Sequence, residues 1–289
     1  MGTYFNPDGE AFRKMIQSEI YVDKTGLLNY TNSVLNTMQG YLCISRPRRF
    51  GKSMAANMLA AYYSRESRAE ELFSGFKISE SPDFQKYANQ YNTIFLNMQD
   101  FLSQSGNVTE MIALLQKSVL WELLGEYPDF RYFDETNLAR TMQDVYQQTK
   151  IPYVIIIDEW DCVFREFKTD REAQEKYLDF LRNLMKDKSY IHLAYMTGIL
   201  PIKKYGTHSA LNMFDEFSMI SRDAGGICRV YGSGSETALR KVSDGSGRSQ
   251  KLVRRIFFRT SAVCLQPAIC RKLHALPQNR KLLESDGNI

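Results

Sequence analysis

Long hydrophobic runs are absent from this sequence of 289 residues. No apolar stretch approaches the roughly 20 residues that a membrane-spanning helix needs, so we predict no membrane segment. The first residues show no basic segment followed by an apolar one, and no signal peptide is expected. We therefore expect a cytoplasmic protein. Its 44% hydrophobic and 24% charged residues are typical of a globular chain.

Cysteine and histidine are scarce and are not spaced like metal ligands. The five cysteines include no C-x-x-C pair, and His192, His208 and His274 lie far apart in the sequence. This spacing matches no common zinc motif and gives no disulfide framework. Cys43 falls in an apolar segment, which favours a small buried side chain in a reducing compartment.

An excess of positive charge is missing from most of the chain. Residues 221–289 hold 13 Lys and Arg against 5 Asp and Glu, whereas residues 1–220 hold 24 against 28. The formal net charge of +4 therefore comes from the tail alone. The body of the protein gives no general signal for nucleic-acid binding.

Hydrophobic periodicity is missing after about residue 220. Residues 221–250 are rich in Ser, Gly and Arg without helical or strand spacing, which is typical of an irregular, disordered basic tail. A second interpretation comes from the genetic code. Shifted by one base after back-translation, residues 224–232 can read L-A-E-Y-V-G-F-T-E, residues 251–258 S-W-Y-D-G-Y-S-F, and residues 282–289 S-Y-W-S-Q-T-E-T. Three patterned segments in one register indicate a frameshift near residue 220, which sequencing of the locus tests.

The body contains a strand, a loop and a helix in an order that suits phosphate binding. Tyr41-Leu-Cys-Ile-Ser-Arg-Pro-Arg-Arg-Phe-Gly-Lys-Ser53 predicts a strand over 41–45, a tight loop, and a helix over 52–64. Backbone N–H groups at a helix N-terminus attract phosphate. Lys52 can reach the β- and γ-phosphates, and the Ser53 hydroxyl can ligate Mg²⁺. The Walker A pattern G-x-x-x-x-G-K-[ST] needs glycine at position 46, where this chain has arginine.

A second segment, about a hundred residues later, carries two carboxylates. Tyr153-Val-Ile-Ile-Ile-Asp158-Glu159 reads as a buried parallel strand, and its carboxylates stand where open α/β sheets bind ligands. We expect Asp158 to hold Mg²⁺ through water and Glu159 to orient and deprotonate an attacking water. The alternative is that the pair merely ends a strand on a solvated loop. The preceding phosphate loop favours the functional interpretation.

Strands and helices alternate along the rest of the body. Further strands are expected over 93–98 and 190–198, and long helices over 108–125, 135–149 and 170–187. This order predicts a mostly parallel sheet with right-handed crossovers and helices on its faces.

Local signals refine this prediction. Short helices are expected over 67–90, and Asn107 and Asp170 suit the N-caps of two of the long helices. In helix 52–64, four apolar side chains share one face and are expected in the core: Met54, Met58, Leu59 and Tyr62.

At these residues the chain resembles the AAA-ATPase-like family of bacterial P-loop proteins. The matching pieces are Tyr21-Val-Asp-Lys-Thr25, Arg46-Pro-Arg-Arg-Phe-Gly-Lys-Ser53, Ile155-Ile-Ile-Asp-Glu159 and Met196-Thr-Gly198. The family itself tends to carry R-P-R-R-F-G-K-S, so the missing first glycine is shared with it. The resemblance covers about residues 5–220.

The resemblance implies an α/β fold of the P-loop NTPase (RecA/AAA-like) type, a three-layer sandwich with a mostly parallel sheet, over residues 1–220. The irregular tail, 221–289, follows it. Family proteins usually continue into a helical region and often into a PD-(D/E)XK nuclease-like domain. The shifted-frame W-Y-D-G-Y resembles that continuation, so the chain is expected to be truncated. This departure puts nuclease activity and any remote arginine contact in doubt.

The resemblance also implies roles for individual residues. Lys52 and Glu159 would be catalytic, Ser53 and Asp158 would hold Mg²⁺, and Thr197 would be a sensor near the γ-phosphate. The implied nucleotide-binding residues are Arg46, Pro47, Arg48, Arg49, Phe50, Gly51, Lys52, Ser53, Met54 and Thr197. ATP rather than GTP is implied by the resemblance alone.

Several neighbouring positions leave alternatives open. An arginine in the basic turn 46–49 meets a phosphate or an acidic partner, or else the turn is simply solvated. Asp161 assists Mg²⁺ or, as the simpler expectation, lies at the surface, and Trp160 is expected to pack in the core. Asp23 and Lys24 frame the nucleotide or cap a helix; the sequence gives no way to choose.

Three functions compete at this point. The first is Mg²⁺-dependent ATP binding and hydrolysis that drives a conformational switch. The second is a nucleotide-binding regulatory module with little turnover, and the third is an inactive, truncated gene product. The expected partners are ATP and an unknown protein client, and nucleic acid enters only by analogy with the family.

Overall fold

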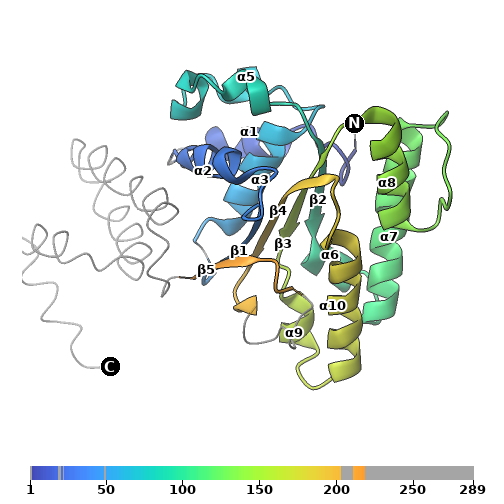
Figure 1. The fold of residues 1–289 in the computed structure, drawn as a ribbon. Helices are drawn as coiled ribbons and strands as arrows, with labels where there is room; N and C mark the ends of the chain where they lie inside the picture. The colour runs from blue at the N-terminus through green and yellow to red at the C-terminus, as the bar shows by residue number, and fades with distance from the viewer. Residues whose placement is uncertain (1, 19–20, 22, 49, 203–210, 219–289) are drawn as a thin grey trace, which may run out of the picture. The chain divides into compact units, whose positions relative to one another are not determined.

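Five strands form one parallel sheet in the part of the chain that the structure describes (Figure 1). The structure, a computed structural model, describes residues 2–18, 21, 23–48, 50–202 and 211–218. In spatial order the strands are β2 (Asn92–Asn97), β3 (Tyr153–Asp158), β4 (Ile191–Gly198), β1 (Tyr41–Ser45) and β5 (Asp215–Ser218). All four pairings are parallel, so the carboxyl ends of the strands meet along one edge.

The two faces of the sheet bury different side chains, because successive residues of a strand point to opposite faces. On β3, Tyr153, Ile155 and Ile157 belong to one hydrophobic cluster, whereas Val154 and Ile156 belong to the other. Every residue of β3 is buried, as expected for a parallel strand covered on both sides. The predicted three-layer α/β sandwich is confirmed.

Helices cover both faces, with α1, α2 and α3 on one side and α7, α8 and α10 on the other (Figure 1). The first cluster of helices is α1 (Glu10–Ile16), α2 (Gly26–Val34), α3 (Lys52–Tyr63), α4 (Ala69–Leu72), the 3-10 helix η1 (Lys77–Glu80) and α5 (Phe84–Tyr87). The second is α6 (Met98–Ser103), α7 (Val108–Glu126), α8 (Leu138–Thr149), α9 (Cys162–Glu166) and α10 (Arg171–Met185).

Asparagine and aspartate side chains start the three long helices. The side chain of Asn107 accepts a hydrogen bond from the Glu110 N–H at the start of α7, and Asp170 caps α10 in the same way. Both caps confirm the sequence prediction. Asn137 caps α8, which therefore begins three residues later than expected.

Helix α3 is buried on almost every side. Nine of its twelve residues are buried, because it packs against the sheet and against α1 and α4. Met58, Leu59 and Tyr62 lie in the core as predicted. The prediction for Met54 was wrong in part: this side chain is only half-buried, because it sits in the first turn, where the helix reaches the edge of the sheet.

Several described elements were not predicted from the sequence, among them the short helices α6 and α9 and the edge strand β5. The domain boundary predicted near residue 220, and with it the tail 221–289, lies outside the described residues. The structure therefore does not test the frameshift, which stays a prediction.

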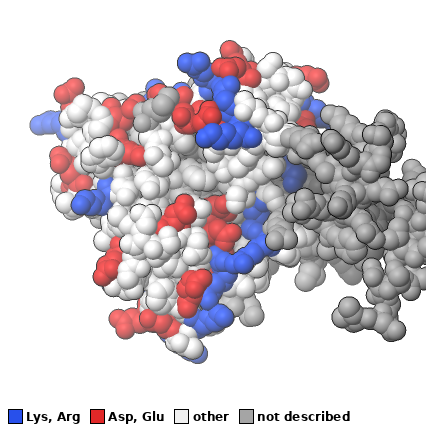
Figure 2. Space-filling view, turned by 180° about the vertical axis from the view of Figure 1, so that it is seen from behind, with Lys and Arg blue, Asp and Glu red and all other residues white. Residues whose placement is uncertain are grey.

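Charges of both signs are mixed on the face shown in Figure 2, where Lys and Arg alternate with Asp and Glu among the described residues. This mixture agrees with the balance of 24 basic and 28 acidic residues in the body. None of the described helices is both long enough and apolar enough to cross a membrane.

Candidate functional site

The carboxyl edge of the sheet brings together the two segments that the sequence singles out. Ser45, the last residue of β1, pairs with Gly198 at the end of β4, and β4 also pairs with β3, which ends at Asp158. Strand β4 therefore lies between the strand that leads into the predicted phosphate loop and the strand that carries the carboxylates.

The predicted phosphate loop joins β1 to α3 and is tied to β4. The Arg46 N–H donates to the Gly198 carbonyl at 3.0 Å. Gly51 is the N-cap of α3, with a left-handed φ of 73° that suits glycine, and as a glycine it has no side chain to cap the helix. The ammonium of Lys52 bends back and donates to the Pro47 carbonyl at 3.1 Å.

The residues of this loop differ in exposure. The Arg46 and Lys52 side chains are buried, at 4% and 6% exposed, so the idea of a wholly solvated basic turn is wrong for Arg46. Pro47, Arg48 and Ser53 are exposed, and Phe50, Gly51 and Met54 are half-buried. Arg49 lies outside the described residues.

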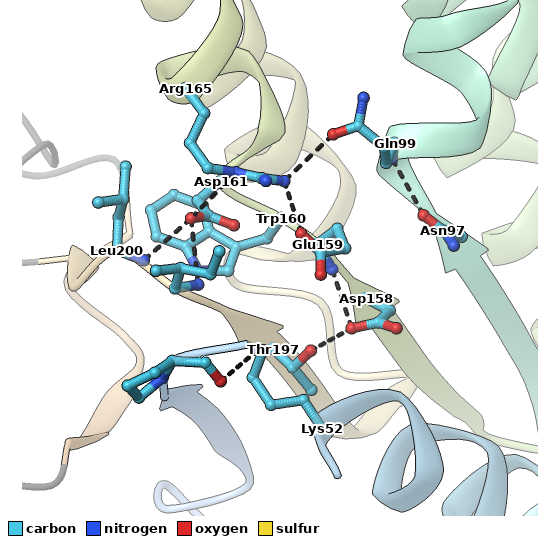
Figure 3. Close-up of polar contacts among 12 residues, drawn as sticks. Lys52, Asn97, Gln99, Asp158, Glu159, Trp160, Asp161, Arg165, Thr197 and Leu200 are labelled. Atoms are coloured by element: carbon cyan, nitrogen blue, oxygen red, sulfur yellow. Dashed lines mark hydrogen bonds and ion pairs between the residues drawn. The ribbon is translucent and has the colours of Figure 1, made fainter. Parts of the chain in front are cut away.

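Asp158 and Thr197 are in direct contact across neighbouring strands (Figure 3). The Thr197 hydroxyl donates to Oδ1 of Asp158, and the same oxygen accepts the Glu159 N–H at 3.0 Å. Both side chains are buried. The hydroxyl residue that the sequence placed at the end of 190–198 thus lies beside the first of the two carboxylates.

Glu159 is held by an arginine that sequence analysis missed. Nη2 of Arg165, on α9, lies 2.5 Å from Oε2 of Glu159 and also donates to Oε1 of Gln99 at 3.2 Å (Figure 3). The backbone of Glu159 has a left-handed φ of 55°, which is uncommon outside glycine and costs roughly 1 kcal/mol. Backbone strain at a carboxylate is typical of functional sites.

Asp161 is buried, so its expected place at the surface was wrong. Its Oδ2 accepts the N–H groups of Ile199 and Leu200 at 3.1 and 2.9 Å and lies 3.5 Å from Nε of Arg165. These bonds satisfy the backbone of the turn after β4, which explains the burial. Asp161 therefore connects α9 to the turn after β4. Its Oδ2 atom is engaged in these contacts, which does not favour the alternative that Asp161 assists Mg²⁺.

Gly198 and Trp160 pack closely beside Asp161. Trp160 is fully buried, as predicted, and Tyr177 donates to its carbonyl at 2.7 Å. A Cβ atom added to Gly198 would lie 2.6 Å from Nε1 of Trp160 and 2.8 Å from Oδ1 of Asp161. Glycine is required here because no side chain fits.

The carboxylates act electrostatically on Lys52. Burial lowers the pKa of the Lys52 ammonium, while the negative charges of Glu159, Asp158 and Asp161 oppose that shift. The lysine and the carboxylates thus share one region at the edge of the sheet. Among the described residues, no group of three or more His, Cys, Asp or Glu forms a ready-made metal cage.

Replacing Asp161 by alanine is expected to lower the free energy of unfolding by about 3 kcal/mol, because two backbone N–H groups lose their acceptor and Arg165 loses one of its two carboxylate partners. Asp161→Asn keeps an amide oxygen and should lose only about 1 kcal/mol. Urea unfolding measures both. An alanine variant as stable as the wild type would contradict this connecting role.

Comparisons with known proteins give a family and two similar chains. A family model described as a predicted AAA-ATPase matches residues 9–207. A curated relative from Azotobacter chroococcum mcd 1, named an uncharacterized protein in the vnfD 5' region, is 26% identical over 208 residues. The match covers 70% of this chain but only 38% of that relative. Among solved structures, the Aeropyrum pernix ORC1 protein in complex with DNA aligns at 13% identity and a TM-score of 0.40, covering 82% of this chain and 55% of that one.

Proposed function

The chain belongs to the predicted AAA-ATPase family, whose model matches residues 9–207, and from this premise we propose that it binds and hydrolyses ATP with Mg²⁺ as a conformational switch. The observation that carries the proposal is the meeting of two segments about a hundred residues apart. The start of α3, with Lys52, and the pair Asp158 and Glu159 share one edge of the sheet and interact electrostatically.

The start of α3 is proposed to bind the triphosphate. Its N-cap is a glycine without a side chain to bond the first N–H groups, which suits phosphate oxygens as their acceptors, and the helix dipole favours the negative charge. Lys52 turns from the Pro47 carbonyl to the β- and γ-phosphates. A buried ammonium gains strength as a phosphate ligand because it is shielded from water.

The donor set present suits a hard cation such as Mg²⁺. Ser53 supplies a hydroxyl in the first turn of α3, and Asp158 supplies a carboxylate whose hydrogen bonds both reach Oδ1. Oxygen donors of this kind, completed by phosphate and water, are those that Mg²⁺ prefers. When bound, the ion would neutralise charge on the phosphates. Thr197 orients Asp158 from the neighbouring strand.

Glu159 is proposed as the general base that activates the attacking water. In this structure its carboxylate is paired with Arg165, which lowers its availability to a water molecule. Release of Glu159 from Arg165 is therefore part of the proposed switch. Asp161 connects Arg165 to the turn after β4. A movement of Arg165 would therefore also shift the backbone at Leu200.

The same ion pair favours a second candidate function, a nucleotide-binding regulatory module with little turnover. If Arg165 keeps Glu159 engaged after ATP binds, the site holds nucleotide without cleaving it. The two candidates share the phosphate site and differ only in hydrolysis.

The first experiment measures binding and turnover on the full chain. We expect Mg-ATP to raise the melting temperature of the purified protein and phosphate to be released on further incubation, and EDTA to abolish the release because Mg²⁺ is removed. A thermal shift without phosphate release would select the regulatory module. A cooperative melt that ATP does not change would contradict both candidates, and a chain without a cooperative melt would fit an inactive truncated product.

A further inference from the structure

A lysine from outside the phosphate loop lies against the glycine that begins α3. The Nζ atom of Lys24 is 2.8 Å from the position that a Cβ atom on Gly51 would take. Gly51 is thus required for two reasons, its left-handed φ of 73° and the ammonium that fills the space of a side chain. The Lys24 ammonium therefore lies at the N-terminus of α3, beside Gly51, the residue that precedes Lys52.

The turn that presents Lys24 is fixed by its neighbour Asp23. Oδ1 of Asp23 accepts the Thr25 N–H at 2.8 Å and Oδ2 accepts the Lys77 N–H at 3.5 Å. The first bond closes a turn around Lys24, and α2 follows directly at Gly26. Asp23 thus holds the backbone of Lys24 in place and ties it to the start of η1.

Three cationic side chains gather around the loop. Arg46 and Lys52 are buried, and Lys24 is half-buried. Burial lowers the pKa of the Lys24 ammonium, and the positive charge of Arg46 lowers it further. Placing Lys24 and Arg46 close together disfavours their charged forms, and a polyanion bound beside them would offset that effect.

We infer that Lys24 is a second phosphate-binding cation of this site, which contacts the terminal phosphates of a nucleoside triphosphate beside Lys52, and that Asp23 is its positioning residue. This inference rests on the proposed nucleotide binding and adds a ligand that lies outside the loop motif. A cation that contacts the terminal phosphate loses that contact in a diphosphate, so Lys24 is expected to favour triphosphate over diphosphate.

The test compares the affinity of Lys24→Gln and wild-type protein for ATP, ADP and AMP by calorimetry. Glutamine keeps much of the length and a hydrogen-bond donor but removes the charge. We expect ATP binding to weaken about ten- to a hundredfold, ADP binding to weaken less, and AMP binding to change little. Lys24→Arg keeps the charge and should bind ATP more tightly than Lys24→Gln. Lys117→Ala, on the exposed side of α7, controls for the loss of one positive charge.

Melting of the variants without nucleotide separates binding from a structural role. Because burial and Arg46 disfavour the Lys24 ammonium while glutamine keeps a hydrogen-bond donor, Lys24→Gln should melt within a few degrees of the wild type. A lower melting temperature combined with an unchanged ratio of ATP to ADP affinity would overturn the inference and make Lys24 structural. Wild-type protein that binds ATP, with Lys52→Ala losing it and Lys24→Gln keeping it, would overturn this inference alone. Wild-type protein that binds no nucleotide would overturn the proposed function together with it.

Discussion

Replacing Lys52 by alanine is expected to remove almost all of the thermal stabilisation that Mg-ATP gives to the wild-type protein. At an ATP concentration 100 times the Kd, binding stabilises the folded state by about 2.7 kcal/mol, which corresponds to a rise of about 5 to 10 °C in a protein of this size. Loss of one buried ammonium that binds phosphate is expected to weaken affinity about a hundredfold. ATP would then be near its Kd, and the rise would shrink to about 1 °C.

The comparison requires that the variant be folded without nucleotide. Among the described residues, the Lys52 side chain donates one hydrogen bond, to the Pro47 carbonyl, and burial lowers the pKa of its ammonium, so its loss should cost the free protein little. Lys52→Met provides a matched control that keeps the apolar stem of the side chain. If both variants melt like the wild type and still respond fully to Mg-ATP, the phosphate site is not at the start of α3.

Changing Glu159 to glutamine is expected to stop hydrolysis and to spare binding. A general base contributes about a hundred- to ten-thousandfold to rate, and glutamine cannot accept a proton from water at neutral pH. Glutamine keeps the size of the side chain, and the change removes a negative charge that acts on Lys52, which does not oppose phosphate binding. The Kd for ATP should therefore stay within about threefold of the wild-type value. A change of that size is much smaller than the change expected from the loss of a phosphate contact. Phosphate release and calorimetry measure the two quantities separately.

Glu166→Gln serves as the control for this substitution. Glu166 is exposed at the end of α9, only seven residues along the chain, and the change in charge is identical. Its hydrolysis rate should match the wild type. Wild-type turnover in Glu159→Gln would show that another group activates the water, and a simultaneous loss of binding would indicate damage to the site as a whole.

Much of the fold follows from patterns that act over a few residues. The apolar runs at β1 and β3, and the caps Asn107 and Asp170, were read correctly because strand burial and helix capping depend on local sequence. Strand β5 was missed because Asp215-Glu-Phe-Ser218 has no apolar run, and its place is set by pairing with β1, far away in the sequence.

The site residues that lie in continuous sequence segments could be predicted. The contacts between segments that are distant in the sequence could not. The loop motif and the pair Asp158 and Glu159 lie in continuous segments, so their types could be read directly. Burial of Asp161 depends on backbone N–H groups at 199 and 200, and the contact of Lys24 with Gly51 spans 27 positions. Such contacts are created by the tertiary fold, which a single sequence does not reveal. The spacing of four residues between Asp161 and Arg165 is the one signal in the sequence that could have indicated their pairing.

The burial of Trp160 gives the protein its own optical probe. The chain has two tryptophans, whose fluorescence arises in different environments. Trp160 is fully buried next to Asp161 and Gly198, whereas Trp121 on α7 is 78% exposed. In a Trp121→Phe background, tryptophan emission comes from a single indole, two residues from Asp158. Rearrangement of the turn after β4 would thus be visible as a change in wavelength or intensity, on the time scale of a stopped-flow instrument and without any attached label.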